Sequence, residues 1–286
     1  MFRRLTLLIA AGAALAALLA GGSPAVTYPQ RIVSLSPTAT EDLFAIGAGK
    51  QVLAVDNQSD YPKQAPRTRL SGFQPNAEAI VGFHPDLVVI QYDPNKLVAA
   101  LKKAKIRVLV QPSARSLADA YAQIGELGAV TGHTPGAKAL VERMRERIAA
   151  LVRSAPRPAT QLTVYDEVSP DFYTATSKTF AGQVLGLFGL KNIGDVADDG
   201  SGFPKLSQEY ILSADPDLIV LTDIRCCGQS PKTVAARPGW SGVEAVKRGA
   251  IVRVDDSIAS RWGPRVVDFA RAIASALRTL SRQPRG

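Results

Sequence analysis

The sequence predicts an α/β protein with two similar Rossmann-like lobes, each built on a mostly parallel sheet, joined by one long bridging helix. Strand-like apolar runs alternate with helical patterns, which favours βαβ units. Residues 78–90 are repeated at 209–221, which indicates internal duplication. The predicted units are a signal peptide at 1–25, an N-terminal lobe at 26–134, the bridging helix at 135–156 and a C-terminal lobe at 157–286.

The composition excludes several classes of protein. The chain has 286 residues, of which 46% are hydrophobic and 21% charged, and these values exclude a disordered chain, a collagen or a disulfide scaffold. The formal net charge of +9 would be typical of a nucleic-acid-binding protein if it were spread over the body. The excess positive charge is concentrated at the two ends of the sequence. Arg3 and Arg4 lie at the start, and the segment from Arg261 onward has six arginines and only one acid, Asp268. We therefore expect no nucleic-acid partner.

Residues 1–25 have the layout of a Sec-type secretory signal peptide. Two arginines precede an apolar run over residues 5–20, and small residues follow. The run is short for a membrane-spanning helix. Residues 19–21 resemble a lipobox, but Gly22 stands where the lipid-bearing cysteine would be. We expect an exported protein without a lipid anchor, most simply a periplasmic one, whose mature chain starts near Val26.

The elements of the N-terminal lobe follow from local signals. Residues 31–35 (RIVSL) form a short strand. The Ser-Pro-Thr sequence at 36–38, with Glu41 three residues after the threonine, opens a helix. Gly47 ends this helix ahead of a second strand at 52–55.

The C-terminal lobe repeats this plan, with a strand at 162–165, a helix at 178–188 and a stop at Gly189. The repeat itself reads EAIVGFHPDLVVI at 78–90 and EYILSADPDLIVL at 209–221. Each copy is a short helix that begins near its glutamate, a Pro-Asp turn and a fully buried strand. A Pro-Asp turn before a strand is common punctuation, so the glutamate and isoleucine that also match support the duplication.

An amphipathic stripe lies between the two lobes. Its members are Ala137, Leu140, Val141, Met144, Ile148, Leu151 and Val152. Spacings of three and four predict one helix face, which begins at Thr134-Pro135 and ends at Pro156. At about 1.5 Å per residue the helix spans roughly 28 Å. Such a helix, packed on both lobes, predicts a rigid pair that faces a cleft.

Taken together, these segments resemble a known family. Residues 31–49 (RIVSLSPTATEDLFAIGAG), the SDYP sequence at 59–62, the two repeats, the bridging helix and RWGPR at 261–265 are similar to the periplasmic substrate-binding proteins of ABC importers for cobalamin, haem and iron siderophores. The likeness is strongest to the cobalamin-binding members and covers the chain from Arg31 to about Leu280.

The resemblance implies a receptor that delivers its ligand to an ABC permease in the inner membrane. In the family, one surface glutamate of each lobe docks onto arginines of the permease, and Glu78 and Glu209 occupy those positions. A duplicated fold would itself present two equivalent carboxylates. The alternative is that each glutamate only stabilises the start of its helix, by under about 1 kcal/mol.

Ligands of two-lobed α/β proteins bind between the lobes, at loops that follow the strands. The predicted ligand-binding residues are Ser36, Asp60, Tyr61, Phe73 and Tyr92 of the N-terminal lobe, and Tyr165, Phe172, Tyr173, Phe203, Arg225, Cys226, Cys227, Arg261 and Trp262 of the C-terminal lobe. Aromatic walls suit a large planar or macrocyclic ligand. Phe73 and Phe203 stand where the cobalamin-binding members have tryptophan, which leaves the wall apolar but smaller. We expect a corrinoid as the ligand, with an iron siderophore or a haem as the alternative.

Other side chains would suit an anionic or iron-containing ligand. Arg225 and Arg261 would attract haem propionates or a carboxylate siderophore, whereas we expect Arg265 to form a structural salt bridge within its lobe. Tyr92 or Tyr165 would be able to ligate haem iron. We predict no resident metal and no cofactor.

The pair Cys226-Cys227 is not explained by the resemblance. Two lone cysteines tend to pair in an oxidising compartment. The Cα atoms of adjacent residues are only about 3.8 Å apart, below the usual range for a disulfide, so such a bridge would lock a tight turn. We predict a vicinal disulfide that forms a rigid apolar bump against the ligand; two free thiols or a soft-metal pair are the alternatives.

An enzyme is the competing class for this fold. The chain has no GxGxxG after its first strand, no GxxxxGK[ST] and no GxSxG sequence. Asp166 and Glu167 would be an acid and a base, but adjacent residues of a strand point to opposite faces. His84 and His133 lie in a turn and before a helix and look like surface residues. We therefore expect a monomeric binding protein, with an exported hydrolase as the less favoured alternative.

Overall fold

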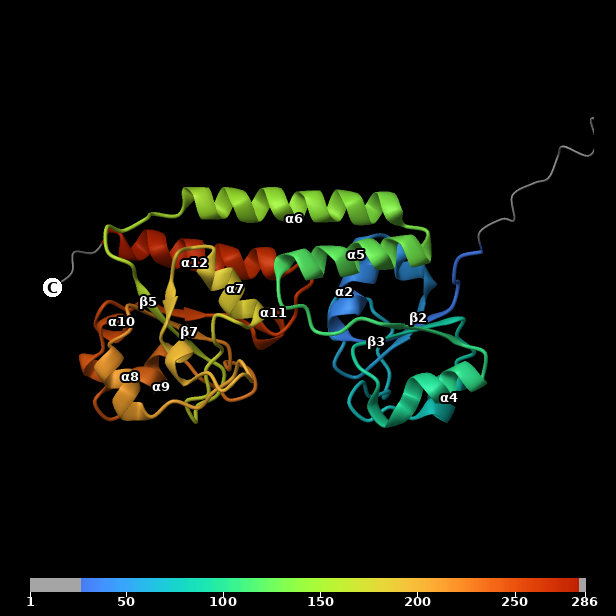
Figure 1. Ribbon diagram of the computed structural model, residues 1–286, viewed down its shortest axis with the longest axis horizontal. Coiled ribbons are helices and arrows are strands. Elements are labelled where there is room, and N and C mark those ends of the chain that lie inside the picture. The colour runs from blue at the N-terminus through green and yellow to red at the C-terminus, as the bar shows by residue number, and fades with distance from the viewer. Residues whose placement is uncertain (1–26, 283–286) are drawn as a thin grey trace, which may run out of the picture.

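A computed structural model of the protein describes residues 27–282. The predicted signal peptide at 1–25 lies outside this range. Two α/β lobes lie side by side, and the long helix α6 (Thr134–Ser154) runs across both (Figure 1). This arrangement confirms the predicted fold class. Within residues 27–282, no helix combines the length and the apolar character that crossing a membrane requires.

The N-terminal lobe is built on one parallel sheet. Its elements are β1 (Ile32–Leu35), α2 (Pro37–Ala45), η1 (Ala48–Gln51), β2 (Val52–Val55), α3 (Ala77–Val81), β3 (Leu87–Ile90), η2 (Pro94–Lys96), α4 (Leu97–Lys103), β4 (Arg107–Val110) and α5 (Leu117–Thr131). The strand order is β2-β1-β3-β4. The helix α2 begins as its Ser-Pro sequence predicts, because the Ser36 side chain accepts the N–H of Ala39.

The C-terminal lobe has the same topology. Its elements are β5 (Thr163–Glu167), α7 (Phe180–Gly186), β6 (Lys191–Asn192), η3 (Ile193–Ala197), α8 (Gln208–Ala214), β7 (Leu218–Leu221), α9 (Pro231–Ala235), η4 (Trp240–Gly242), α10 (Glu244–Lys247), β8 (Ile251–Arg253), α11 (Asp256–Ala259) and α12 (Val266–Leu280). Its strands are parallel in the order β6-β5-β7-β8. The helix predicted from residue 178 begins later, because Thr179 is its cap.

The duplication is visible in the backbone. His84 and Asp215, which align in the repeat, both have a left-handed conformation, with φ of 50° and 42°. The next acid of each repeat ties two strands together: the carboxylate of Asp86 accepts the N–H of Arg31 at 3.0 Å, and that of Asp217 accepts the N–H of Thr163 at 2.9 Å. The matched sequences therefore build matched turns in the two lobes.

The bridging helix is packed against both lobes. It lies on α5 and α12 (Figure 1) and buries Ala137, Leu140, Met144 and Ile148. One continuous cluster of buried side chains includes this stripe and core residues of both lobes. The helix ends before the predicted residue 156, since Ala155 precedes a proline and is already extended. The lobes are thus joined by a shared core as well as by the chain.

Candidate ligand-binding site between the lobes

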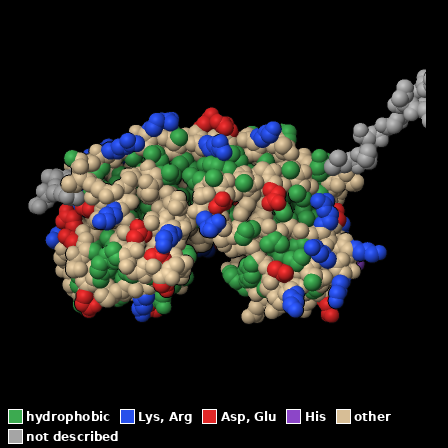
Figure 2. All heavy atoms as spheres, viewed as in Figure 1, with side chains coloured by type: hydrophobic (Ala, Val, Ile, Leu, Met, Phe, Trp, Pro, Cys, Tyr) green, Lys and Arg blue, Asp and Glu red, His purple; other side chains and the backbone are tan. Residues whose placement is uncertain are grey.

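A cavity of about 1140 Å³ lies between the lobes, and Figure 2 shows the molecule hollowed there, on the side away from α6. The N-terminal lobe lines it with Gln91, Ser113, Ala114, Arg115, Ser116 and Asp119. The C-terminal lobe contributes Asp166, Lys178, Phe203, Cys226, Asp256 and Trp262 among others. This volume exceeds the usual range for small-molecule sites, about 300–1,000 Å³, so the cavity suits a large ligand.

The cavity wall mixes apolar and uncharged polar groups. Amides and hydroxyls come from Gln91, Ser113, Thr179, Gln183 and Ser260. The two cations of the lining, Arg115 and Lys178, are balanced by acids in the same wall. The described lining contains no tyrosine and no histidine. This surface offers many hydrogen bonds and little net charge.

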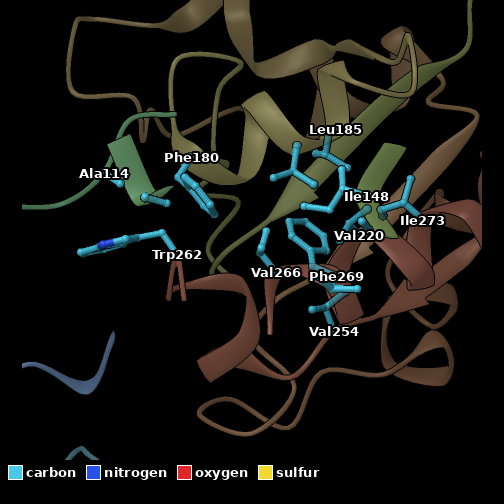
Figure 3. Close-up of a cluster of buried hydrophobic side chains, with 14 of the residues drawn as sticks. Ala114, Ile148, Phe180, Leu185, Val220, Val254, Trp262, Val266, Phe269 and Ile273 are labelled. Carbon is cyan, nitrogen blue, oxygen red and sulfur yellow. The ribbon is translucent and has the colours of Figure 1, made fainter. Parts of the chain in front are cut away.

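Three of the predicted ligand-binding residues belong to the lining: Phe203, Cys226 and Trp262. The ring of Phe203 is 51% exposed, so it is open to a ligand. Trp262 is 7% exposed, and its Nε1–H donates to Oε1 of Gln123 at 2.7 Å, which joins the C-terminal lobe to α5. Figure 3 shows Ala114, Phe180 and Trp262 together at one end of the buried cluster, so the core of the protein reaches the cavity wall.

Four other predicted aromatic residues are exposed but do not line the cavity. Tyr61, Phe73, Tyr92 and Tyr173 are between 40% and 67% exposed. The rings of Phe73 and Tyr92 have centroids 6.4 Å apart, and Tyr92 directly follows Gln91 of the lining. Much of each of these four side chains is open to solvent, so they remain predicted contacts for the parts of a ligand that extend beyond the cavity.

Three of the predicted contacts have structural roles. Ser36 is 1% exposed and caps α2. Tyr165 is fully buried, packs on Trp240 at 6.1 Å and does not line the cavity, and burial raises the pKa of its phenol. Phe172 is half-buried and stacks on Trp240 at 5.9 Å. The expectation that Tyr165 ligates haem iron is therefore wrong, because its side chain belongs to the lobe core.

Arg261 and Arg265 form ion pairs that cross between the lobes. Nη1 of Arg261 lies 2.9 Å from Oε1 of Glu41, and its Nη2 lies 2.9 Å from Oδ1 of Asp60. Arg265 binds the same Glu41 through Nε and Nη2 at 2.9 and 2.6 Å. Burial opposes the ionisation of Asp60, but the charges of Arg261 and Arg225 hold its pKa below the usual value. The salt bridge of Arg265 thus joins two lobes, which corrects the expectation that it lies within one.

Arg225 is the most exposed of the predicted cations. Its side chain is 58% exposed, and Nη1 lies 3.5 Å from Asp60 and 3.4 Å from Asp255. Since Arg261 is only 10% exposed and already bound to two acids, it does not offer free positive charge to an anion. Arg225 alone remains a predicted ligand contact of this kind.

The structure confirms the vicinal disulfide between Cys226 and Cys227. Both residues are exposed, and Cys226 lines the cavity. The carboxylate of Asp256 accepts the N–H groups of Arg225 and Cys226 at 2.9 and 2.7 Å. This acid therefore fixes the turn that carries the disulfide to the cavity rim.

Glu78 and Glu209 lie at matching places. Each is exposed and is the second residue of its helix, α3 or α8, behind a side-chain cap from Asn76 or Ser207. The helix α8, and α4 on which α3 packs, both lie on the side away from α6 (Figure 1). The helices that carry these two residues thus belong to the side of the molecule on which the hollow opens.

Sequence reasoning missed most of the polar lining. Gln91 and Thr222 directly follow the buried strands β3 and β7, and a strict search of the first residue after each strand would have found them. The segment at 113–116 was missed because β4 is half-exposed and reads weakly as a strand. Among residues 27–282, no group of His, Cys, Asp and Glu has the arrangement of a metal site.

The comparisons with known proteins agree on the family. Residues 32–258 match the periplasmic binding protein family. The chain is 32% identical over 258 residues to an uncharacterized ABC transporter substrate-binding lipoprotein of Bacillus subtilis, covering 87% of this chain and 80% of that one. It is 31% identical over 256 residues to a cobalamin-binding protein of Halobacterium salinarum, covering 87% and 69%.

Solved structures share the fold. The periplasmic haem-binding protein of Roseiflexus sp. RS-1 is 23% identical, with a TM-score of 0.76 over 88% of this chain and 99% of that one. The periplasmic vitamin B12-binding protein of Vibrio cholerae is 22% identical, with a TM-score of 0.73 over 89% and 99%. Proteins that bind haem and vitamin B12 thus have the same architecture. This solute-binding class implies an exported protein, and the chain belongs to the periplasmic binding protein family.

Proposed function

We propose that this protein is the solute-binding receptor of an ABC importer, and that it binds a corrinoid such as cobalamin (vitamin B12) between its lobes and delivers it to a permease in the inner membrane. The observation that carries this proposal is the cavity of about 1140 Å³ with walls from both lobes. The 31% identity to a cobalamin-binding protein supports the same ligand class.

The chemistry of the wall favours a corrinoid over a haem. The side arms of a corrinoid are mostly uncharged amides, which need donors and acceptors such as Gln91, Gln183 and Ser260. Two haem propionates need free cations, but the described lining has only two cations, Arg115 and Lys178. Nζ of Lys178 already lies 2.8 Å from Asp198, which leaves Arg115 alone for two carboxylates. A corrinoid brings its own metal ligands, so it does not require a tyrosine or histidine in the wall.

The second candidate ligand is a haem or an iron siderophore. The exposed phenols of Tyr61, Tyr92 and Tyr173 favour it, because a tyrosine oxygen is a suitable ligand for ferric iron. These three side chains lie outside the described cavity lining, which is why the corrinoid is proposed first.

The rigid connection between the lobes would also position the receptor for docking onto the permease. The helix α6 and the shared core hold the lobes together, so we propose that the ligand is captured with little closure of the cleft. Glu78 and Glu209 would then contact arginines of the permease while the hollow faces it. One chain supplies both walls, so we propose that the receptor works as a monomer.

The test is titration of residues 26–286 with cobalamin, haem and a siderophore panel, followed by absorbance and calorimetry. We expect one-to-one saturation with the corrinoid and no turnover. Phe203→Ala should weaken binding about three- to tenfold through lost ring contact. Val196→Ala is the matched control, because Val196 is 73% exposed and outside the lining. Saturation by haem alone, or by none of the ligands, would contradict the corrinoid proposal.

A further inference from the structure

Asp166 is a buried acid in the wall of the interlobe cavity. It lies near the end of β5 and belongs to the cavity lining, yet it is fully buried. Neither of its carboxyl oxygens has a hydrogen-bond partner within the described residues. The adjacent Glu167 binds Arg237 through two contacts of 2.6 Å. The neighbouring cation is therefore engaged elsewhere, and the Asp166 carboxyl is left without a partner.

A second buried acid lies next to it. Asp223 follows β7, the strand paired with β5, and both of its carboxyl oxygens are also unpartnered. An isolated buried carboxylate costs several kcal/mol and tends to keep its proton. Burial and then the charge of Asp223 raise the pKa of Asp166 to about 8. At neutral pH Asp166 is mostly a neutral acid, which both donates and accepts a hydrogen bond.

Charged groups on the surrounding elements have other partners. Lys178 pairs with Asp198. Three nearby acids accept backbone N–H groups: Asp195 of η3 from Ser177, Asp119 from Arg115, and Asp256 from Arg225 and Cys226. For Asp223, burial and the charge of Glu167 raise the pKa to about 7, while Arg237 opposes them. Lys191 of β6 is exposed. None of these groups bonds to the Asp166 carboxyl.

The lining beside Asp166 is made of small residues. Ala175, whose N–H donates to the backbone oxygen of Asp166 at 3.1 Å, and Thr222, whose N–H donates to that of Glu167 at 2.9 Å, both line the cavity. The two neighbours of this part of β5 that reach the cavity wall therefore have short side chains. An unpartnered acid in the wall of a large cavity has the chemistry of a binding subsite.

We propose that Asp166 is the subsite for an uncharged primary carboxamide arm of the ligand, with its O–H donating to the amide oxygen and its carbonyl accepting from the amide N–H. A protonated acid and a primary amide each have one donor and one acceptor for this pair of hydrogen bonds. A carboxylate arm has no N–H to donate, so it would form only one of the two bonds. The inference rests on the proposed corrinoid-binding function, since corrinoids carry such arms, and it names the residue that distinguishes an amide arm from a propionate.

The test is calorimetric titration of the full mature chain with cyanocobalamin from about pH 6 to about pH 9.5. Loss of the Asp166 proton should weaken wild-type binding about tenfold between pH 7 and pH 9, as one linked proton requires. Asp166→Asn keeps a donor and an acceptor without titrating, so its affinity should not change with pH. Asp166→Leu should bind about tenfold more weakly than wild type at pH 7, because it makes neither bond.

Two further variants separate this subsite from a general effect of charge. Asp223→Asn removes a charge that raises the pKa of Asp166, so the decline should move to lower pH. Asp42→Asn is the matched control: Asp42 is also buried with a raised pKa but is outside the lining, and it should decline like wild type. Binding without a pH dependence, or an equal decline in Asp166→Asn, would overturn the subsite alone. Absence of binding at every pH would overturn the proposed function together with it.

Discussion

Arg265 and Glu41 form a two-contact ion pair that joins the lobes, with Nε to Oε2 at 2.9 Å and Nη2 to Oε1 at 2.6 Å. Glu41 also accepts Nη1 of Arg261, and its own side chain is only 1% exposed. Two sequences far apart in the chain, TED near residue 41 and RWGPR near residue 263, therefore meet at one buried carboxylate. This contact fixes the lobes independently of α6.

Replacing Glu41 should destabilise the protein. Glu41→Gln removes the paired carboxylate of the largely buried Arg265 and one of the two that bind Arg261, and breaking a buried pair in this way costs about 3–5 kcal/mol. Urea unfolding would measure the loss. The matched control is Asp268→Asn, which removes a half-exposed partner of Arg271 and should cost under about 1 kcal/mol. Equal effects of the two variants would contradict the role assigned to Glu41.

Charge reversal at both docking residues should stop uptake without changing ligand affinity. Glu78→Lys with Glu209→Lys places two cations where the permease arginines are proposed to bind, and both side chains are exposed and outside the cavity lining. Transport into cells or vesicles and calorimetry would measure the two properties separately. Glu142→Lys with Glu146→Lys, exposed on α6, is the control and should transport normally. A loss of affinity in the docking variant would refute this role.

The fold followed from the sequence because its signals are local. Buried parallel strands, capped helix starts and the repeated turn at His84 and Asp215 are each encoded within a few residues. The site was only partly predictable, because the exposure of each side chain depends on residues that are distant in the sequence and pack against it. Tyr165 and Phe203 were both predicted to contact the ligand, but only Phe203 is exposed. The ring of Tyr165 packs on Trp240, which is far away in the chain. Arg261 finds its acids in the other lobe.

The vicinal disulfide should protect both cysteines from alkylation. Cys226 and Cys227 are exposed, so free thiols at these positions would react readily with iodoacetamide, whereas a disulfide would not. Mass spectrometry should find no label on the native protein without reductant and two labels after reduction. A second measurement uses Cys226→Ser with Cys227→Ser, which should weaken ligand binding if the bridge forms part of the cavity rim. Double labelling of the unreduced protein would contradict the bridge.

Asp166, the buried acid of the cavity wall, should also make stability depend on pH. The pKa of Asp166 is about 8 in the folded protein and starts from a reference value of 3.8, so the folded state binds the extra proton between these values. The free energy of unfolding should therefore fall as pH rises from about 4 to about 8, by up to about 1.4 kcal/mol per pH unit for one fully linked proton. Asp166→Asn removes this linkage, so its advantage over wild type should grow across that window in urea unfolding. In the control Asp119→Asn, the lost acid has a lowered pKa, held down first by the N–H of Arg115; its offset from wild type should stay constant above about pH 5. A constant offset for Asp166→Asn as well would mean that the buried carboxyl is ionised in the folded protein.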